Sequence, residues 1–176
     1  MNKAKVATCW LDGCSGCHMS LLDIDEALIQ VARKADIVYG PLVDAQEFPE
    51  GVDVALVEGA VSSHEDQKLI QTIRRRTQLL VALGDCAVTG NVPSMRNGIP
   101  LNRLLERVYV EGAAAEPGVP ADGVPGLLKK AVPLHEIVKV DLYIPGCPPK
   151  PEAIGYAVLE LLNGRKPDMT SRVKFG

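Results

Sequence analysis

Short apolar runs alternate with amphipathic segments along most of this chain. The first run shows no regular alternation of apolar and polar residues, which is typical of a strand that is covered on both faces. Five such runs predict strands at residues 6–11, 37–39, 52–57, 79–83 and 139–144. Between them, apolar side chains recur at intervals of three and four residues, which predicts helices.

Capping residues indicate where these helices begin and end. Ser20 with Asp23 fits a capping box that opens a helix to about Lys34, and Ser63 with Asp66 opens a second helix, which ends near the arginines at 74–76. We expect those arginines to form a solvated last turn that complements the helix dipole. A final helix begins at a proline, 151, and ends at a glycine, 164.

Alternating strands and helices predict an α/β fold with a mostly parallel, five-stranded sheet and helices on both faces. Five strands fit the flavodoxin-like doubly wound arrangement. We expect one domain over residues 1–176, interrupted by a long irregular region at about 87–138 that is rich in proline and glycine. Only residues 101–108 of that region have a helical pattern. A loop of this length is usually functional or disordered, so we expect it to contact partner subunits.

Composition narrows the possible partners and the compartment. The net charge of −3 gives no reason to expect a nucleic acid or an anionic membrane as partner, and no apolar run has the length of a transmembrane helix. The first residues lack the apolar block of a signal peptide, so we expect a cytoplasmic protein. Five cysteines in a reducing compartment indicate metal binding or redox chemistry rather than disulfides.

Four of the cysteines follow predicted strands. Cys14 and Cys17 come after the first strand, Cys86 after the fourth and Cys147 after the fifth, while Glu58 closes the third. Because the carboxyl ends of parallel strands meet at one edge of a sheet, we expect these side chains to gather there. Four thiolates at one place favour a cubane iron–sulfur cluster.

Other interpretations of the cysteines stay open at this point. Structural zinc usually uses two close cysteine pairs, whereas this chain has one pair and two distant single residues. A thioredoxin-like dithiol would explain Cys14 and Cys17 alone, and Cys86 and Cys147 would then be buried apolar side chains. Cys9 lies inside the first strand, before the loop, and is expected in the core.

Taken together, the cysteine motifs resemble those of the small subunit of [NiFe]-hydrogenases, in the same order and over the whole chain. Within that family, the likeness is to the small hydrogenase subunit of soluble, NAD-reducing bidirectional enzymes. The motifs are Cys14-Ser15-Gly16-Cys17, Glu58-Gly59, Gly84-Asp85-Cys86-Ala87 and Pro145-Gly146-Cys147-Pro148-Pro149, with Asp85-Cys86-Ala87-Val88-Thr89-Gly90-Asn91-Val92-Pro93 as the longer signature.

The resemblance implies a function in electron transfer. Cys14, Cys17, Cys86 and Cys147 would bind one proximal [4Fe–4S] cluster. A separate large subunit would hold the Ni–Fe site, and diaphorase subunits with FMN and further iron–sulfur clusters would reduce NAD⁺. The complex would catalyse H₂ + NAD⁺ = H⁺ + NADH, and this chain would not be catalytic alone.

Departures from the relatives refine this interpretation. We expect neither the export signal nor the C-terminal cluster domain of periplasmic and membrane-bound relatives, and the sequence has no tandem cysteines like those of the related subunit of respiratory complex I. Gly16 and Asn91 stand where oxygen-tolerant relatives add cysteines, so we expect an ordinary cluster.

The Glu-Gly motif suggests a role for Glu58 near the cluster and the large subunit, as an acceptor of a proton or of a backbone hydrogen bond. The alternative is a plain surface carboxylate at a strand end. Two rival functions remain: an FMN-binding flavodoxin, and an assembly subunit whose cluster is structural.

Overall fold

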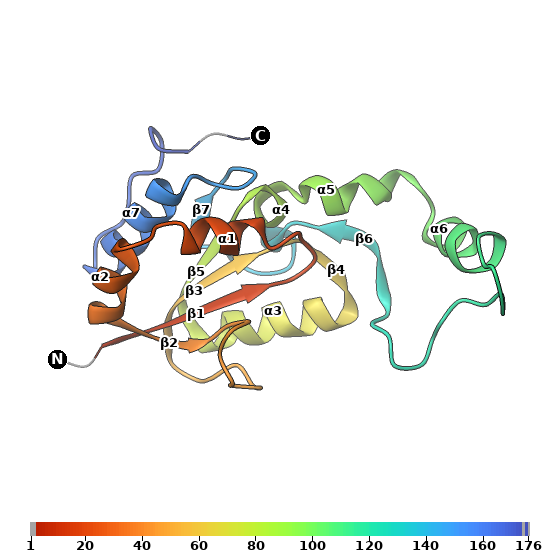
Figure 1. Ribbon diagram of the computed structural model, residues 1–176, viewed down its shortest axis with the longest axis horizontal. Coiled ribbons are helices and arrows are strands. Elements are labelled where there is room, and N and C mark those ends of the chain that lie inside the picture. The colour runs from red at the N-terminus through yellow and green to blue at the C-terminus, as the bar shows by residue number, and fades with distance from the viewer. Residues whose placement is uncertain (1–2, 174, 176) are drawn as a thin grey trace.

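The computed structural model describes residues 3–173 and 175, and its centre is a five-stranded sheet with the order β2-β1-β3-β5-β7 (Figure 1). Every neighbouring pair in this sheet is parallel. The order is that of flavodoxin-like doubly wound sheets, so the predicted fold class is confirmed. The strands are β1 Ala4–Trp10, β2 Ala35–Tyr39, β3 Val52–Glu58, β5 Thr77–Leu83 and β7 Leu142–Ile144.

Helices cover both faces of the sheet, and each face has its own core. On one face lie α1 Gly16–Leu22, α2 Ala27–Lys34 and α7 Pro151–Leu162, and on the other lies α3 His64–Arg76 (Figure 1). Ile154 and Val158 of α7 are buried in the first core, together with Val31 of α2. The chain therefore buries the central strands on both sides, as their continuous apolar runs predicted.

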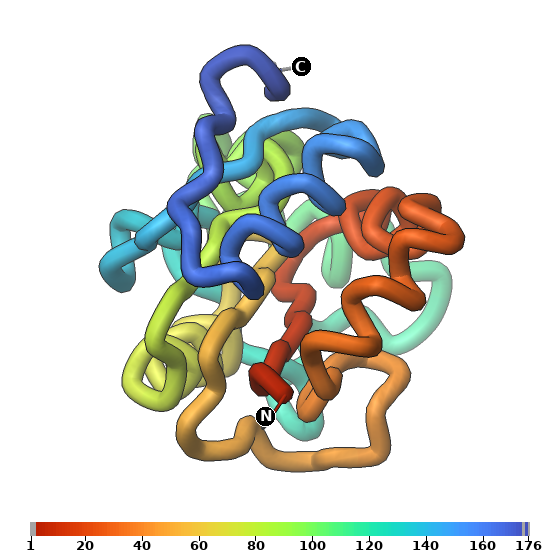
Figure 2. The backbone as a smooth tube through the Cα atoms, turned by 90° about the vertical axis from the view of Figure 1, so that its left-hand side faces the viewer, coloured from red at the N-terminus to blue at the C-terminus, as the bar shows by residue number. Residues whose placement is uncertain are grey.

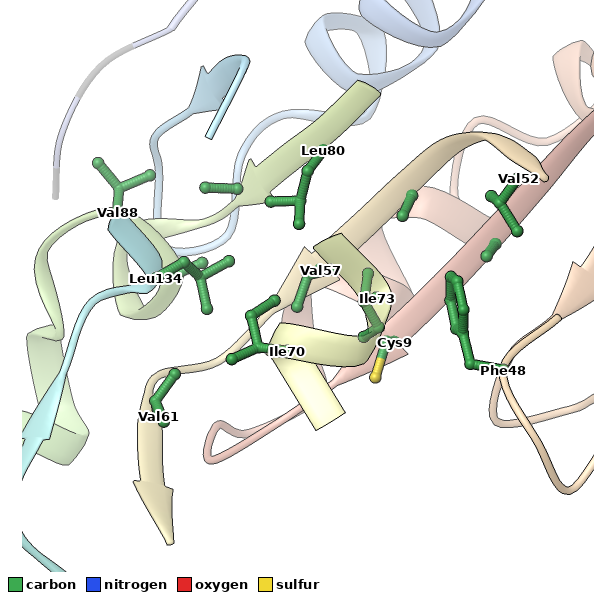
Figure 3. Packing of buried hydrophobic residues seen from close by; sticks show 14 residues of the cluster. Cys9, Phe48, Val52, Val57, Val61, Ile70, Ile73, Leu80, Val88 and Leu134 are labelled. Carbon is green, nitrogen blue, oxygen red and sulfur yellow. The ribbon is translucent and has the colours of Figure 1, made fainter. Parts of the chain in front are cut away.

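The core beneath α3 is fully apolar (Figure 3). Ile70 and Ile73 project from α3 towards Val57 of β3, and Leu80 of β5 lies in the same cluster. These side chains are fully buried, and each is worth about 1.5–3 kcal/mol relative to exposure to water. This packing fixes the strands whose ends carry the candidate site.

The first helix does not begin where the sequence predicted. The capping box expected at Ser20 is wrong: α1 begins at Gly16, within the cysteine loop, and a turn with Asp25 at φ 51° separates it from α2. The Ser20 hydroxyl instead donates a 2.5 Å hydrogen bond to the carbonyl of Pro149. The Ser20 hydroxyl is therefore engaged by a residue far away in the chain and does not cap a helix. The capping box at the start of α3 is confirmed.

The arginines at the end of α3 were expected to form a solvated last turn, and this expectation is wrong for Arg74 and Arg76. Arg74 contacts Asp141 at 2.5 Å and donates to the carbonyls of Thr77 and Gln78. Arg76 donates to the carbonyl of Phe48. These contacts tie the end of α3 to the loops before β3 and β7, because a guanidinium can serve several acceptors at once.

The region expected to be irregular contains much regular structure. A strand, β6 Leu127–Val132, pairs antiparallel with β4 Val61–Ser63, and both amide atoms of Asn97 bond the backbone of Ala131 at 2.7 and 2.8 Å. The arm around α6 projects to one side of the body in Figure 1, and in Figure 2, which is viewed from the side opposite the arm, it lies behind the rest of the chain. The remaining elements are α4 Asp85–Thr89, α5 Asn91–Ser94, η1 Met95–Gly98, α6 Leu101–Glu106, the π-helical η2 Arg107–Glu111 and η3 Leu134–Glu136.

No helix within residues 3–173 has both the length and the apolar character needed to cross a membrane.

Candidate functional site

The four motif cysteines line one cavity of about 140 Å³ at the carboxyl edge of the sheet. Cys14 and Cys147 are exposed, whereas Cys17 and Cys86 are partly buried, so the cavity lies just under the surface. The expectation that three separate loops bring these thiols together is therefore met. The rest of the lining consists of Gly13, Gly16, Glu58, Gly59, Asp85, Gly146 and Pro148.

The first loop is held by backbone hydrogen bonds to the end of β3. Asp12 and Ala60 exchange two N–H···O bonds of 3.1 and 2.8 Å, and the N–H of Leu11 donates to the carbonyl of Glu58. A Cβ at Gly13 would lie 3.3 Å from the Cα of Gly59, so the two chains approach closely there. Glycine permits this approach and leaves space beside Cys14.

Two glycines next to the cysteines are required by the geometry. Gly84 has φ +82°, and a Cβ there would lie 2.2 Å from Cys17 Sγ. Gly146 has φ +138°, and its Cβ would lie 2.6 Å from the Cα of Pro149. Any larger residue would therefore push against a thiol or a ligand loop, in a backbone conformation that L side chains rarely adopt.

Asp85 joins the two loops that carry the single cysteines. Its backbone N–H donates to the carbonyl of Gly146 at 2.9 Å, and the N–H of Gly146 donates to Asp85 Oδ1 at 2.6 Å. The side chain is buried, so this reciprocal pair is shielded from water. Cys86 and Cys147, each one residue away, are held at a fixed separation as a result.

Glu58 is buried at 2% exposure and lines the cavity, which excludes the alternative of a surface carboxylate. Its Oε2 accepts a 2.8 Å hydrogen bond from the backbone N–H of His18, and Nδ1 of the same histidine lies 3.0 Å from that oxygen. The predicted position beside the cysteines is confirmed, whereas a place at the large-subunit interface and the acceptance of a proton or a backbone hydrogen bond during redox change stay predictions. This contact also ties the start of α1 to the end of β3.

The electrostatics of the cavity disfavour free thiolates. Burial raises the pKa of Cys17 well above its usual value, and the Glu58 carboxylate and the other thiols raise it further. Burial also raises the pKa of Cys86, against a backbone hydrogen bond from Val92 that lowers it. Deprotonating these thiols together requires positive charge among them, which metal ions supply.

The cavity fits a multi-atom cluster. Its volume is several times the roughly 30 Å³ that one water takes in the liquid, and four soft sulfur donors surround it. Within residues 3–173 and 175, there is no group of at least three histidine, cysteine, aspartate or glutamate side chains placed to bind a single metal ion.

Cys9 is separate from this site, as its position in the first strand predicted. It is 5% exposed in the core beneath α3, and its Sγ donates to the carbonyl of Trp10 at 3.6 Å (Figure 3). Burial raises its pKa to about 12, so the thiol stays protonated at neutral pH.

The sequence placed Asp85 and Asn91 in the cysteine motifs but did not reveal the contacts that their side chains make. Asp85 directly precedes Cys86 at the end of a strand. That position was the only indication in the sequence that its carboxylate could join two cysteine-bearing segments. Asn91 donates from Nδ2 to Cys147 Sγ at 3.6 Å. No spacing rule could find that contact, because 56 residues separate the pair.

The sequence is similar to those of known proteins. The sequence profile of the family described as NADH ubiquinone oxidoreductase, 20 Kd subunit, matches residues 14–161. The delta subunit of the NAD-reducing hydrogenase HoxS from Cupriavidus necator is 40% identical over 176 residues, which cover 97% of this chain and 84% of that protein. A subunit of the F420-non-reducing hydrogenase vhu from Methanocaldococcus jannaschii is 40% identical over 171 residues, or 96% of this chain. This chain spans 59% of that relative.

Solved structures agree with the fold. A chain in the crystal structure of an NAD⁺-reducing [NiFe]-hydrogenase in the H₂-reduced state superposes with a TM-score of 0.94 at 40% identity, over 99% of this chain and 100% of that one. A chain of the [NiFeSe] hydrogenase from Desulfovibrio vulgaris Hildenborough, at 19% identity, shares only the fold, with a TM-score of 0.60 over 93% of this chain and 60% of that one. The chain therefore belongs to the family of the NADH ubiquinone oxidoreductase 20 Kd subunit, and its resemblance to [NiFe]-hydrogenase small subunits is confirmed.

Proposed function

We propose that this chain is the electron-transfer small subunit of an NAD-reducing [NiFe]-hydrogenase, whose reaction is H₂ + NAD⁺ = H⁺ + NADH. One observation carries the proposal: four thiols from three loops surround a single cavity just beneath the surface. The likeness over nearly the full chain to subunits of NAD-reducing hydrogenases supports it. A cytoplasmic location is part of the same proposal.

The proposed cofactor is one [4Fe–4S] cluster held by Cys14, Cys17, Cys86 and Cys147. The donor set, the cavity volume and the clearance left by Gly84 support this assignment. The cluster would supply one-electron storage when bound, and the protein sets its position and electrostatic surroundings.

The residues around the cavity have distinct tasks in this proposal. The hydrogen bond between Asp85 and Gly146 holds together the segments that carry Cys86 and Cys147. The Ser20 hydroxyl holds Pro149, two residues after Cys147, by a hydrogen bond to its carbonyl. Glu58 places a carboxylate beside the cysteines and orients the first turn of α1 through the N–H of His18. Rigid loops of this kind reduce the rearrangement that accompanies each electron transfer.

The proposed partners are a large subunit with the Ni–Fe site and diaphorase subunits with FMN and iron–sulfur clusters. Electrons must enter and leave at the cavity, and the exposure of Cys14 and Cys147 makes both steps accessible there. Large apolar side chains stand exposed at the end of β1, on α1 and on α5, with Trp10 46%, Met19 61% and Val92 61% exposed. Such a set is typical of a surface that a partner covers. The segment 87–138 would contribute to the same contacts.

The acceptor distinguishes this proposal from its nearest rival. The relatives also include subunits of F420-non-reducing hydrogenases, which this chain matches over 59% of the length of the Methanocaldococcus jannaschii protein. The match to the NAD-reducing subunit covers 84% of that protein, which favours NAD⁺ as the acceptor. Hydrogen-dependent reduction of NAD⁺ by the purified complex is the discriminating assay.

Spectroscopy of the complex, purified without oxygen, tests the cofactor. A cluster in this chain gives a broad brown absorption band and an electron paramagnetic resonance (EPR) signal on reduction, and both contributions disappear in Cys86→Ser while those of the partner subunits remain. Retention of the full signal in that variant would contradict the ligand set. The difference spectrum between the unmodified complex and Cys86→Ser would show structured yellow bands if this chain held FMN, as in the flavodoxin alternative, and no band if it held zinc.

A further inference from the structure

We propose that Asn91 tunes the reduction potential of the cluster by donating a side-chain hydrogen bond to Sγ of Cys147. The inference rests on the proposed function, because it needs a cluster on that thiol. The amide Nδ2 lies 3.6 Å from the sulfur. A thiolate can only accept hydrogen bonds, so the NH₂ group of the amide faces it and the carbonyl oxygen points elsewhere.

The backbone is shaped to hold Asn91 in this position. Gly90 has φ +86° and Asn91 has φ +31°, so two successive residues have left-handed backbone angles. Asparagine tolerates this conformation better than other residues with a side chain. The Ser94 hydroxyl donates to the carbonyl of Asn91 at 2.8 Å, and the N–H of Ser94 donates to the carbonyl of Gly90. The donor is therefore fixed before a cluster arrives.

The same turn serves a second cysteine. The backbone N–H of Val92 forms a hydrogen bond with the Cys86 thiol, while the side chain of Asn91 reaches Cys147. Adjacent residues thus direct donors at two cysteines that come from different loops. This arrangement places positive ends of N–H dipoles where added electron density would gather on sulfur.

The direction of the effect follows from charge. A reduced cluster carries one more negative charge than an oxidised one, and its thiolate sulfurs share that charge. A donated N–H bond therefore stabilises the reduced form more than the oxidised form and raises the reduction potential. Removing the donor lowers the potential, and replacing it by a carboxylate lowers it further.

The test is an EPR-monitored redox titration of the assembled complex. The cluster signal is identified by its loss in Cys86→Ser. Asn91→Gly keeps the backbone conformation and removes the donor, and Asn91→Asp replaces the donor with a negative charge. Asn102→Asp makes the same amide-to-carboxylate change on the exposed face of α6, away from the cavity. We expect the one-electron equilibrium to shift by about threefold to tenfold in Asn91→Gly, at most about 59 mV downward.

Asn91→Asp should shift the potential further in the same direction, and Asn102→Asp should leave it unchanged. An unchanged potential in Asn91→Gly, with the cluster signal intact, would overturn the inference and leave the proposed function standing. A complex with no iron–sulfur signal that depends on Cys86 would instead overturn both.

A second measurement needs no variant. When asparagine side chains alone carry ¹⁵N, pulsed EPR on the reduced complex should detect a weak nitrogen coupling to the cluster, because Asn91 is the asparagine beside the cavity among the described residues. Absence of that coupling would overturn the inference even if the Asn91 variants failed to assemble.

Discussion

Residues of one type behave differently here because their surroundings differ. Cys9 lies in an apolar core with a pKa of about 12, whereas Cys14 is exposed at the edge of the cavity. Only thiolates bind metal ions or react with alkylating agents. Burial therefore separates Cys9 from the exposed candidate ligand Cys14, although burial also raises the pKa of Cys17.

This difference gives a prediction for thiol labelling. After iron is removed from the complex at pH 8, iodoacetamide should modify Cys14 readily and leave Cys9 unmodified, because only about one Cys9 thiol in ten thousand is ionised at that pH. Mass spectrometry of the labelled peptides measures the result. Comparable labelling of Cys9 and Cys14 in folded protein would contradict the assignment of Cys9 to the core.

A second prediction at this scale concerns Glu58. Replacing it with glutamine keeps an oxygen that can accept from the N–H of His18 and removes a negative charge beside the cavity. The reduced cluster should gain stability, which raises the reduction potential by up to about 59 mV, or a tenfold change in equilibrium. EPR-monitored redox titration is the measurement, and Glu152→Gln on the exposed side of α7 is the control. If Glu58→Gln changed neither potential nor turnover, the carboxylate would have no role at the cluster.

The cysteine positions could be predicted from the sequence, and their hydrogen-bond partners could not. Each cysteine follows an apolar run, and the topology of parallel sheets places such positions together. The contacts of Asp85 with Gly146 and of Asn91 with Cys147 join residues far apart in the chain, so no local pattern reports them.

At the scale of elements, the loops after the strands determine the site. Local capping signals predicted the start of α3 correctly because Ser63 and Asp66 each accept from the backbone N–H of the other in a local capping box. They failed at α1, because Ser20 bonds Pro149 and the helix begins inside the cysteine loop. The pairing of β4 with β6 was also missed, since β4 has only three residues and its partner lies beyond a long arm.

Gly84, between β5 and α4, gives a prediction about the clearance that the cluster needs. In Gly84→Ala the new Cβ would overlap Cys17 Sγ, so iron content should fall sharply. Gly123 also has a positive φ, +72°, but a Cβ added there would meet no atom within 4 Å, so Gly123→Ala is the matched control. Iron per purified complex is the measurement. Equal iron in both variants would show that the clearance at Gly84 is not needed for the cluster.

At the scale of the whole molecule, an ion pair joins the end of α3 to strands β5 and β7. Arg74 at the end of α3 contacts Asp141, which lies just before β7, and Asp141 also accepts from the N–H of Leu80. Partial burial alone would raise the pKa of Asp141, but the Leu80 N–H and the Arg74 guanidinium outweigh it and hold that pKa below its usual value.

The depressed pKa predicts how stability depends on pH. Stabilisation by Asp141 is fully present above the unfolded-state pKa of about 3.9 and is lost as the pH falls through the lower folded-state pKa. Asp141→Asn should therefore lower the thermal midpoint of the complex near neutral pH, and the difference should shrink below about pH 4. A difference that stayed constant from pH 7 to pH 3 would contradict this account.

The proposed assignment of the cofactors to different subunits gives a further prediction. Produced alone, this chain should neither oxidise hydrogen nor reduce NAD⁺, because the Ni–Fe site and the FMN belong to the proposed partners. Assays of hydrogen-dependent dye and NAD⁺ reduction check this. Clear activity in a preparation with no detectable large subunit would contradict the relay function.

The central claim is that the four-cysteine cavity holds one [4Fe–4S] cluster. The most direct measurement is the EPR spectrum and iron content of the reduced complex in three forms: unmodified, Cys86→Ser and Cys9→Ser. We predict that Cys86→Ser loses one cluster signal with its iron, while Cys9→Ser retains both. An unchanged signal in Cys86→Ser, or its loss in Cys9→Ser from folded complex, would contradict the account.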